Sequence, residues 1–484
     1  MEVILFERPV VIHYAIIIIS FTCVFSFIKI IYRMSWHPLA NIPGPKFAAA
    51  TRLYGAYHDL LTEGSLVRRV AKLHAKYGPV VRISPNEVHV NDLGSYNKIF
   101  RVGSDFHKKW DFYNARAIEG SLLNILDTST ARKRKEAYAQ YFSRFAVDKI
   151  ESLIHKHIDI FLSILEDASR SQAPIDLSRA FRCLTADVIV DYSFRQDFEG
   201  LKSNNFIHPL IEAGDLMLVY AQWGIYFRKP FLLLDLLINS NPTPEDSEFP
   251  TIFDKLLNPA ANKGQQVPSD DALAAESILM LLAGTDTTAN ALVVGVYGTL
   301  KNPEIVAMLK RELQEARLGE LKEKIGSTLR NLPYLNAIIK ESLRLSHGAP
   351  GRIPRIVPEG GITIEDMLIP SGTVISHSAY IYHMNEAVFP NAAEFIPERW
   401  LGANHRELES NLLSFSRGSR MCLGIHLGMA ELQLTFARVF EAFHFTLHET
   451  SKSDMEWSDY SVALFKGHLK VMVEEGSPRV QRHF

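Results

Sequence analysis

The sequence predicts a mainly α-helical fold with a small β part, preceded by a membrane-spanning helix. Over most of the chain, apolar residues recur at the spacing of helix faces, and short strand-like patches stand between turn residues. An unbroken apolar run lies near the N-terminus. The 484 residues suffice to bury a large core. The net charge of -2 gives no indication of a nucleic-acid partner, and we expect none.

The apolar run at 10–28 is long enough, at about 1.5 Å per helical residue, to cross the roughly 30 Å of a bilayer core. Lys29 and Arg33 follow it, whereas Glu2, Glu7 and Arg8 precede it. Because cytoplasmic flanks of membrane helices are rich in Lys and Arg, we expect the rest of the chain on the cytoplasmic side. A cleaved signal peptide is the alternative, but the run is long for one and no small-residue cleavage site follows.

We therefore divide the chain into three parts. Residues 1–33 are predicted to form an N-terminal tail and a single-pass transmembrane anchor. Residues 34–46 are predicted to form a hinge, stiffened by Pro43 and Pro45. Residues 47–484 remain as the globular part.

The elements of the globular part are predicted from periodicity and turn residues. Strand-like patches lie at 79–83, 87–90, 362–364, 367–369 and 373–375. Helical spacing covers 129–165, 272–300 and 335–345, and a final apolar helix ends near residue 443. The helix at 272–300 follows a polar connector at 258–271 and is apolar on nearly every side, which predicts that it is buried.

Only three cysteines occur, Cys23, Cys183 and Cys422. So few cysteines, in an odd number, argue against a disulfide framework and favour a reducing compartment. We interpret Cys23 and Cys183 as packing residues, since free cysteine is often buried. Cys422 differs from both because glycines and arginines surround it in the sequence.

The segment 415–424 has the chemistry of a thiolate metal site. Cys422 is expected at the start of a helix, where free N–H groups and the positive end of the helix dipole favour thiolate over thiol. Gly418 permits a backbone angle that turns the loop under a flat ring, and Gly424 lets the helix approach that ring. Arg420 offers a charged fork for a carboxylate.

This pattern resembles the haem-binding signature of the cytochrome P450 family, with Phe415, Gly418, Arg420, Cys422 and Gly424 all in place. The resemblance extends from the proline-rich hinge to the last helix. It implies that the globular part is one haem-thiolate catalytic domain of the P450 type. It also implies haem b as cofactor, with Cys422 as the axial thiolate, which favours O–O bond cleavage.

A second motif, at 283–288, lies inside the predicted buried helix. Glycine there costs about 1 kcal/mol relative to alanine, and a buried aspartate is costly unless it is paired. One interpretation is that the threonines bond back to the preceding turn and that Asp286 is paired elsewhere. The resemblance implies another, an oxygen groove in which Thr287 lies beside dioxygen and Asp286 belongs to a proton relay.

Glu341 and Arg344 share one face of the helix at 335–345, so an ion pair between them is expected. Such pairs are common on protein surfaces. The resemblance, however, implies that Arg399 joins them in a buried cluster. The predicted role of this cluster is structural, to hold the core around the cysteine loop, and not acid–base catalysis.

The resemblance also implies that Arg355 and Arg134 bind haem propionates. Arg134 lies four residues after Thr130, where the family commonly has tryptophan or histidine, and Arg132 is its rival for this role. A solvated basic face is the alternative interpretation of this stretch.

For the substrate, the resemblance places the binding wall at 106–126, 206–226, 349–353 and 462–465. The aromatic and aliphatic residues there fit an apolar small molecule, although each aromatic taken alone also fits ordinary core. The residues at 37–39, 346–350 and 397–401 resemble those of fungal enzymes of secondary metabolism, terpenoid ones especially.

The leading hypothesis is a monomeric monooxygenase of the endoplasmic reticulum membrane that inserts one oxygen atom from O2 into such a molecule. Because no dinucleotide fingerprint or fused flavin domain is visible, electrons of NADPH are expected through a flavoprotein reductase. The basic stretch 132–135 either docks this reductase or serves the propionates. The alternatives are a haem-thiolate isomerase or dehydratase that needs no oxygen, which the Asp286–Thr287 pair argues against, and a haem-binding sensor or carrier.

Overall fold

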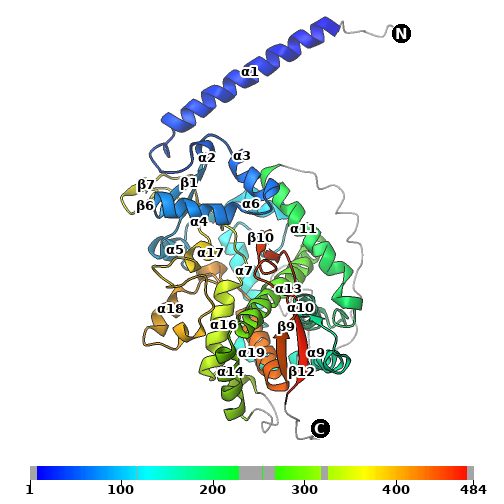
Figure 1. Ribbon diagram of the computed structural model, residues 1–484. Coiled ribbons are helices and arrows are strands. Elements are labelled where there is room, and N and C mark those ends of the chain that lie inside the picture. Colours follow the sequence, from blue (N-terminus) through cyan, green and yellow to red (C-terminus); the bar gives the residue numbers. More distant parts are fainter. Residues whose placement is uncertain (1–7, 117, 228–252, 254–267, 318–324, 477–484) are drawn as a thin grey trace, which may run out of the picture.

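The computed structural model describes residues 8–116, 118–227, 253, 268–317 and 325–476. Within these residues the protein is mostly helical with small sheets, which confirms the predicted fold class (Figure 1). Several positions used in the sequence predictions lie outside the described residues, namely Glu2, Glu7, Ala117 and most of the connector at 258–271.

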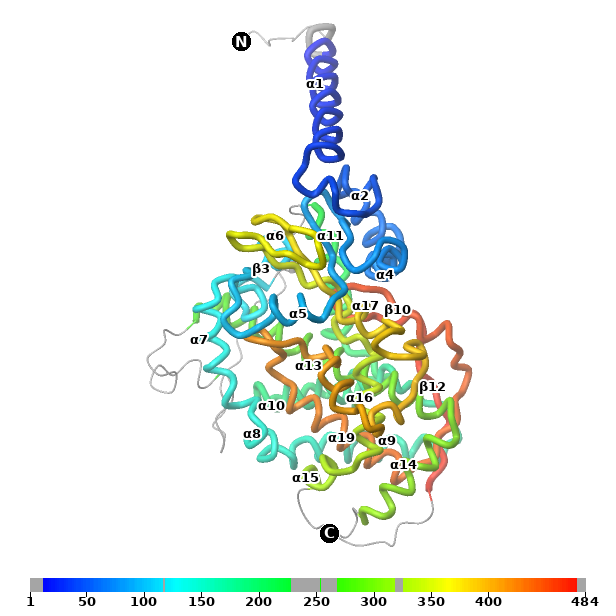
Figure 2. Tube along the Cα trace, turned by 90° about the vertical axis from the view of Figure 1, so that its left-hand side faces the viewer, coloured from blue at the N-terminus to red at the C-terminus, as the bar shows by residue number. Residues whose placement is uncertain are grey.

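Helix α1 (Arg8–Ser35) stands away from the globular body (Figures 1 and 2). From Ile12 to Ser35 it is long and apolar enough to cross a membrane, and none of its apolar window is buried. Among the described residues, helix α13 (Asp270–Leu300) passes the same test of length and composition, but half of its window is buried inside the body. The N-terminal helix thus has the length, composition and exposure of a membrane anchor, whereas α13 is the predicted core helix.

The proline-rich connector after α1 is docked on the body. The carbonyl of Pro43 accepts the Arg82 N–H at 2.7 Å. The Arg82 guanidinium in turn donates to the carbonyls of Arg33 and Leu39, at 3.0 and 3.2 Å. The segment predicted as a hinge is therefore packed against strand β1 (Val80–Ser84), and α1 leaves the body at Arg33.

The body is built around α13, which packs along α10 (Leu177–Phe194) and also contacts α16 (Pro333–Leu345) and α19 (Ile425–Ala442). Apolar side chains of these four helices form one large buried cluster. The other helices are α2 (Lys46–Ala50), α3 (Leu53–Ala56), α4 (Leu66–Tyr77), α5 (Leu93–Ile99), α6 (Trp110–Tyr113), α7 (Thr128–Ala139), α8 (Arg144–Lys149), α9 (Glu151–Ser171), α11 (Pro209–Tyr226), α14 (Pro303–Glu315), α15 (Gly326–Leu329), α17 (Ala379–His383) and α18 (His405–Asn411). Single turns of 3-10 or π helix are η1 (Tyr57–Leu61), η2 (Asn114–Arg116), η3 (Asn204–Phe206), η5 (Pro397–Trp400) and η6 (Gly418–Arg420).

Small sheets complete the body. The largest has the strand order β1-β2-β8-β5-β3, in which only β2 and β8 run parallel. Its further strands are β2 (Glu87–Val90), β3 (His107–Lys108), β5 (Arg355–Ile356) and β8 (Val374–Ser376). The remaining strands are β4 (Ile175–Asp176), β12 (Lys470–Glu475) and β9 (Phe443–Leu447) in one sheet, with the pairs β6 (Ile362–Ile364) and β7 (Met367–Ile369), and β10 (Trp457–Asp459) and β11 (Ala463–Phe465).

All five predicted strand patches form strands within a residue of their predicted bounds. The helical stretch predicted at 129–165 is divided into α7, α8 and α9. Helix α7 ends at Ala139, and Ser143 caps the start of α8 by accepting the Ala146 N–H at 3.2 Å. Sequence reasoning missed the C-terminal strands. They are short, and β12 pairs with β4 from the middle of the chain, a pairing that local periodicity does not report.

Candidate active site around Cys422

The loop at 415–424 is held by its own backbone and by a distant carbonyl. The Cys422 N–H donates to the Phe415 carbonyl at 2.8 Å, which closes the loop. Gly418 has a φ of 69°, and a Cβ there would overlap the Phe100 carbonyl. Glycine is therefore required at this position both by backbone angle and by tertiary contact.

Cys422 stands just before α19. Its side chain keeps accessible surface, although enough protein surrounds it for burial to raise the pKa of its thiol. The thiol is thus accessible at its surface although protein atoms surround it closely. Next to it, a Cβ on Gly424 would meet no atom within 4 Å. A thiol beside an open, side-chain-free surface fits a flat cofactor whose metal takes the sulfur as ligand.

Two groups favour the thiolate form of Cys422. The Gly424 N–H bonds to the sulfur, and the positive charge of Lys135 lies nearby, so both oppose the rise of the thiol pKa. Lys135, in α7, also donates from Nζ to the carbonyls of Met421 and Ser419, at 2.9 and 3.2 Å. Sequence reasoning assigns the basic stretch to propionates or partner docking and misses this contact, because it depends on how α7 packs against the loop.

Helix α13 brings the second motif beside the cysteine loop. A Cβ on Gly428 in α19 would lie 3.4 Å from the Thr288 hydroxyl, so the two helices touch here. Ala283 and Thr287, one turn apart on α13, keep accessible surface, whereas Asp286 is buried. This accessible face belongs to the helix that contacts α10, α16 and α19. The Thr287 hydroxyl donates to the Ala283 carbonyl at 2.8 Å, and its oxygen is left to accept a hydrogen bond.

Asp286 is paired with an arginine that sequence reasoning missed. Arg182 of α10 donates through Nε to Asp286 at 2.7 Å, and through both terminal nitrogens to Asp215 of α11, at 2.9 and 2.5 Å. Burial raises the pKa of Asp286, the Arg182 charge opposes this rise, and the Asp215 charge adds to it. The carboxyl therefore has an ion partner and at the same time a raised affinity for a proton. The separation of 104 residues between Arg182 and Asp286 leaves no local signal of their contact.

Two of the predicted propionate partners lie in one small cavity. Arg355 and Arg420 line it together with Lys108, which sequence reasoning did not single out. Arg355 donates to the Tyr113 hydroxyl at 2.6 Å, and Arg420 donates to the Ile125 carbonyl at 2.9 Å. A cavity lined by several cations fits carboxylate groups.

Arg134 does not line this cavity. Its Nη1 donates to Glu276 of α13 at 3.2 Å, and Glu276 also accepts the Leu122 N–H at 2.9 Å. Burial raises the pKa of Glu276 to about 7, against the opposing charge of Arg134. Arg132 points outward to an exposed ion pair with Glu136 at 3.8 Å, so only Arg134 of the two rivals points inward. A propionate contact of Arg134 stays a prediction.

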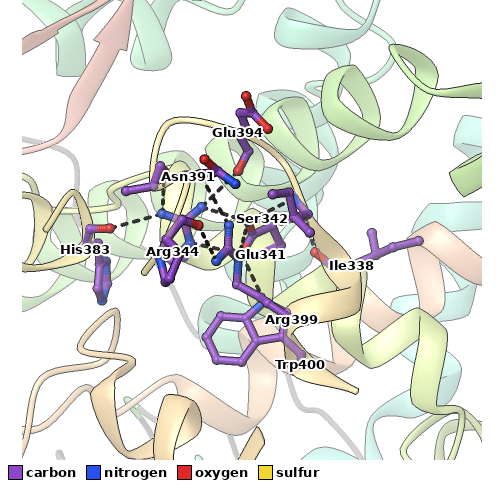
Figure 3. Close-up of polar contacts among 12 residues, drawn as sticks. Ile338, Glu341, Ser342, Arg344, His383, Asn391, Glu394, Arg399 and Trp400 are labelled. Carbon is purple, nitrogen blue, oxygen red and sulfur yellow. Dashed lines mark hydrogen bonds and ion pairs between the residues drawn. The ribbon is translucent and has the colours of Figure 1, made fainter. Parts of the chain in front are cut away.

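The residues Glu341, Arg344 and Arg399 meet in one cluster (Figure 3). Glu341 and Arg344 of α16 are both 0% exposed, and their side chains form two hydrogen bonds, at 2.7 and 2.9 Å. Arg399 adds a third bond to Glu341 at 3.1 Å, and the Trp400 indole adds a fourth at 2.9 Å. With both carboxylate oxygens occupied, Glu341 has the surroundings of a structural group and not of a proton carrier.

The cluster is joined to the cysteine loop by further hydrogen bonds. Arg344 donates to the His383 carbonyl at 3.0 Å, and the His383 ring accepts the Leu413 N–H at 2.8 Å. Directly afterwards in the chain, the Ser414 hydroxyl donates to the Leu343 carbonyl at 2.9 Å. Loop 415–424 therefore begins at a point tied to α16 from two sides.

The segments predicted to form the substrate wall meet around a second cavity of about 50 Å³. Phe112, Gln222 and Ile353 come from three of these segments, and Ser461 stands directly before the fourth. The lining thus combines aromatic, aliphatic and polar side chains.

Comparison with known proteins agrees with this site. The sequence model of the family described as Cytochrome P450 matches residues 45–243 and 243–472. The chain is 32% identical to the cytochrome P450 monooxygenase ankB of Aspergillus thermomutatus, over 93% of this chain and 91% of that protein. It is 31% identical to the cytochrome P450 monooxygenase hkm5 of Aspergillus hancockii, over 92% of each. It is 30% identical to the cytochrome P450 monooxygenase BOT1 of Botryotinia fuckeliana, over 95% of each. With full-length relatives of one kind and a cysteine loop suited to a planar cofactor, the chain belongs to the cytochrome P450 family and is a cytochrome P450 monooxygenase.

Proposed function

We propose that this monooxygenase inserts one oxygen atom from O2 into an apolar fungal secondary metabolite, with a terpenoid as the favoured class. The observation that carries the proposal is the contact of α19, which follows the cysteine loop, with α13 at Thr288, next to the Asp286–Thr287 motif. In this proposal the accessible surfaces of Cys422 and Thr287 border one space that holds the haem. The aromatic and aliphatic residues of the second cavity support an apolar substrate. The fungal origin of the relatives supports the metabolite class.

The residues around this space have separate tasks. Cys422 binds the iron of haem b as a thiolate, and Arg355 and Arg420 bind the propionates. When bound, the haem supplies the iron at which dioxygen is activated. Thr287 offers its hydroxyl to the dioxygen side of the space. Asp286 holds the proton that passes towards this hydroxyl, a task for which its raised pKa suits it.

Electrons come from NADPH through a flavoprotein reductase that docks at a basic surface. Arg132 and Lys133 are exposed on α7, the helix whose Lys135 contacts the cysteine loop, so positive charge lies on the protein surface close to Cys422. Charge of this kind steers an acidic partner surface.

The chain is anchored by α1 in the membrane of the endoplasmic reticulum, and its catalytic domain lies on the cytoplasmic side. The exposure of the whole apolar window of α1 supports the anchor. Exposed apolar residues continue on the part of the body nearest α1, with Phe47, Leu53 and Tyr57 exposed by 56%, 57% and 52%. Residues 47–484 act as one monomeric catalytic domain.

The first test is the reduced, carbon-monoxide difference spectrum of membranes from cells that express the protein. We expect the strongly red-shifted Soret band of thiolate ligation in the wild type and its loss in Cys422→Ala. The matched control is Cys23→Ser, in the exposed helix α1, which keeps the band. A red-shifted band in Cys422→Ala, or a histidine-type band in the wild type, contradicts the proposal.

The second test is turnover. Purified enzyme, reductase and NADPH are incubated under isotopically labelled O2 with extracts of the source organism, and mass spectrometry detects products that carry one labelled oxygen atom. Turnover without reductase or O2 supports the isomerase or dehydratase instead. Bound haem without substrate-dependent electron consumption supports the sensor or carrier.

A further inference from the structure

The second cavity has a polar side that an entirely apolar substrate does not need. Phe112, Ile225 and Ile353 supply its apolar lining, whereas its polar lining residues are Gln222, Arg352, Asp459 and Ser461. Its volume of about 50 Å³ is small, so it fits a functional group at one end of a molecule and not a whole substrate.

Gln222 is the group in this cavity whose hydrogen-bonding capacity is unused. Its residue is only 4% exposed, and it lines the cavity from α11. Among the described residues its side-chain amide has no hydrogen-bond partner, and neither amide atom is completely enclosed by protein. Because a buried amide without a partner is unfavourable, the cavity is suited to a ligand that supplies one.

Arg352, by contrast, is already neutralised. Its Nε lies 2.9 Å from the Glu87 carboxylate, and its Nη1 lies 3.4 Å from the Asp59 carboxylate. The Tyr226 hydroxyl, which donates to Asp59 at 2.5 Å, closes this network over the end of α11. The charge of Arg352 is balanced by two carboxylates, although its buried Nε has no hydrogen bond of good geometry. Arg352 therefore does not provide the unpaired cation that a carboxylate ligand requires.

The cavity lies next to the cation-lined cavity assigned to the propionates. Phe112 lines the second cavity, and the hydroxyl of the following residue, Tyr113, accepts a hydrogen bond from Arg355 of the first cavity at 2.6 Å. Ile353 and Arg355, two residues apart, likewise divide between the two cavities. A group bound beside Gln222 would therefore lie on the side of this cavity that adjoins the residues assigned to the propionates.

We propose that this cavity binds a neutral oxygen function of the substrate, a hydroxyl or a carbonyl, through a hydrogen bond to the Gln222 amide. The inference rests on the proposed function and deepens it, because it makes the substrate a hydrocarbon skeleton that already carries oxygen. An earlier reaction that introduces oxygen, by oxidation or by hydration, must then supply this substrate. The competing occupant is ordered water, since the cavity is polar and large enough to hold it.

The test compares matched probes on full-length, haem-loaded enzyme. Dissociation constants are measured from the Soret shift for cyclododecane, cyclododecanol and cyclododecanone, and for cedrane and cedrol. We expect the wild type to bind each oxygenated probe roughly tenfold more tightly than its parent hydrocarbon. In Gln222→Met, which keeps the side-chain length, this preference disappears and the hydrocarbons bind equally well or better.

The matched control is Ile225→Val, on the same helix and in the same cavity, which weakens both members of a pair alike and keeps their ratio. Equal binding of alcohol and hydrocarbon by the wild type overturns the inference, as water-filled space would predict. The inference is also overturned if the preference for oxygenated probes persists in Gln222→Met, because the oxygen is then held elsewhere. It is likewise overturned if no oxygenated probe binds. The carbon-monoxide spectrum of each sample separates the two proposals. An intact thiolate band without a preference for oxygenated probes refutes only the inference about Gln222. Absence of the thiolate band in the wild type refutes the proposed function.

Discussion

The Asp286 carboxyl depends on side chains from other helices more than on its own. Burial and the negative charge of Asp215 raise the pKa of Asp286, whereas the positive charge of Arg182 lowers it. The arginine holds one carboxylate with each end of its guanidinium, so it joins α10, α11 and α13 at the point where the proton relay is proposed. The proton affinity of Asp286 is therefore set by how these helices pack.

Replacing Arg182 should disturb proton delivery and leave haem binding intact. In Arg182→Ala the pKa of Asp286 rises further because the only opposing charge is lost. We expect product formed per NADPH to fall by roughly tenfold, within the range of a general acid, and peroxide release to rise. The control is Arg179→Ala, on the same helix, whose arginine forms a pair with Asp176 at 3.8 Å. Full coupling in Arg182→Ala would remove this arginine from the relay.

Glu276 makes the stability of the protein depend on pH. Its pKa is raised to about 7 in the folded state, so the folded protein binds the proton more tightly than the unfolded chain. The contribution of this proton to the free energy of unfolding is complete below the ordinary pKa of a glutamate and is lost as pH rises through about 7. At about 1.4 kcal/mol per pKa unit, the loss amounts to about 3 kcal/mol.

We therefore expect Glu276→Gln to be more stable than the wild type at pH 8 but not at pH 5, as measured by thermal midpoints. The amide oxygen of glutamine can still accept from Leu122 and Arg134. Glu136→Gln on the exposed side of α7 is the control and should show no such pH dependence. A constant difference between Glu276→Gln and the wild type across this range would contradict the raised pKa.

At the scale of elements, the buried cluster at Glu341 joins α16 to the turn η5 and to the segment before the cysteine loop. Glu341 accepts from Arg344 on its own helix, from Arg399 and Trp400 of η5, and from the Ile396 N–H at 3.0 Å. The Glu341 carboxylate thus fixes the position of α16 relative to η5 more narrowly than apolar contacts alone, because hydrogen bonds are directional. Position matters here because the cysteine loop begins at the same junction.

Glu341→Gln should give poorly folded protein with little haem. The substitution leaves Arg344 buried without its counter-charge, and breaking a buried pair costs about 3 to 5 kcal/mol. The measurement is the ratio of Soret to protein absorbance, together with the thermal midpoint. The control is Glu394→Gln, which lies beside the cluster but contributes only its backbone carbonyl to Arg344, at 3.1 Å, with its residue exposed (Figure 3). A haem-loaded Glu341→Gln with a wild-type midpoint would refute the structural role.

At the scale of the whole molecule, α1 and the body are almost separate, and their junction is defined by Arg33. The Arg33 guanidinium donates to the Ala50 carbonyl at 2.6 Å, and its own carbonyl accepts from Arg82 at 3.0 Å. The last residue of the predicted anchor 1–33, Arg33, is therefore bonded to the globular body.

Deletion of residues 2–32 should preserve the catalytic domain. We expect the truncated protein to keep the thiolate-type spectrum and to move mostly from the membrane pellet to the soluble fraction after cell lysis. Further replacement of Arg33 by alanine should lower the thermal midpoint, because the Ala50 carbonyl loses its side-chain donor, whereas the backbone carbonyl of residue 33 can still accept from Arg82. Loss of the spectrum on deletion of 2–32 would show that α1 is needed for the fold and not only for anchoring.

The sequence by itself determined the features that depend on neighbouring residues. These are the apolar helix α1, the core helix α13 and the glycine-rich loop that ends at Cys422, each visible as a local pattern of burial, turn or backbone angle. The pairing of Glu341 with Arg344 was also accessible, because three residues on one helix face are neighbours.

Tertiary structure alone decided which partners these residues have. Arg182 reaches Asp286, Arg134 reaches Glu276, and Lys135 reaches the cysteine loop, each across more than a hundred residues of sequence. The physical reason is that ion pairs and hydrogen bonds act over a few ångströms, whereas sequence periodicity reports only which face of an element is apolar. The way in which the helices pack brings these charges together, and the same packing leaves the Gln222 amide facing a cavity.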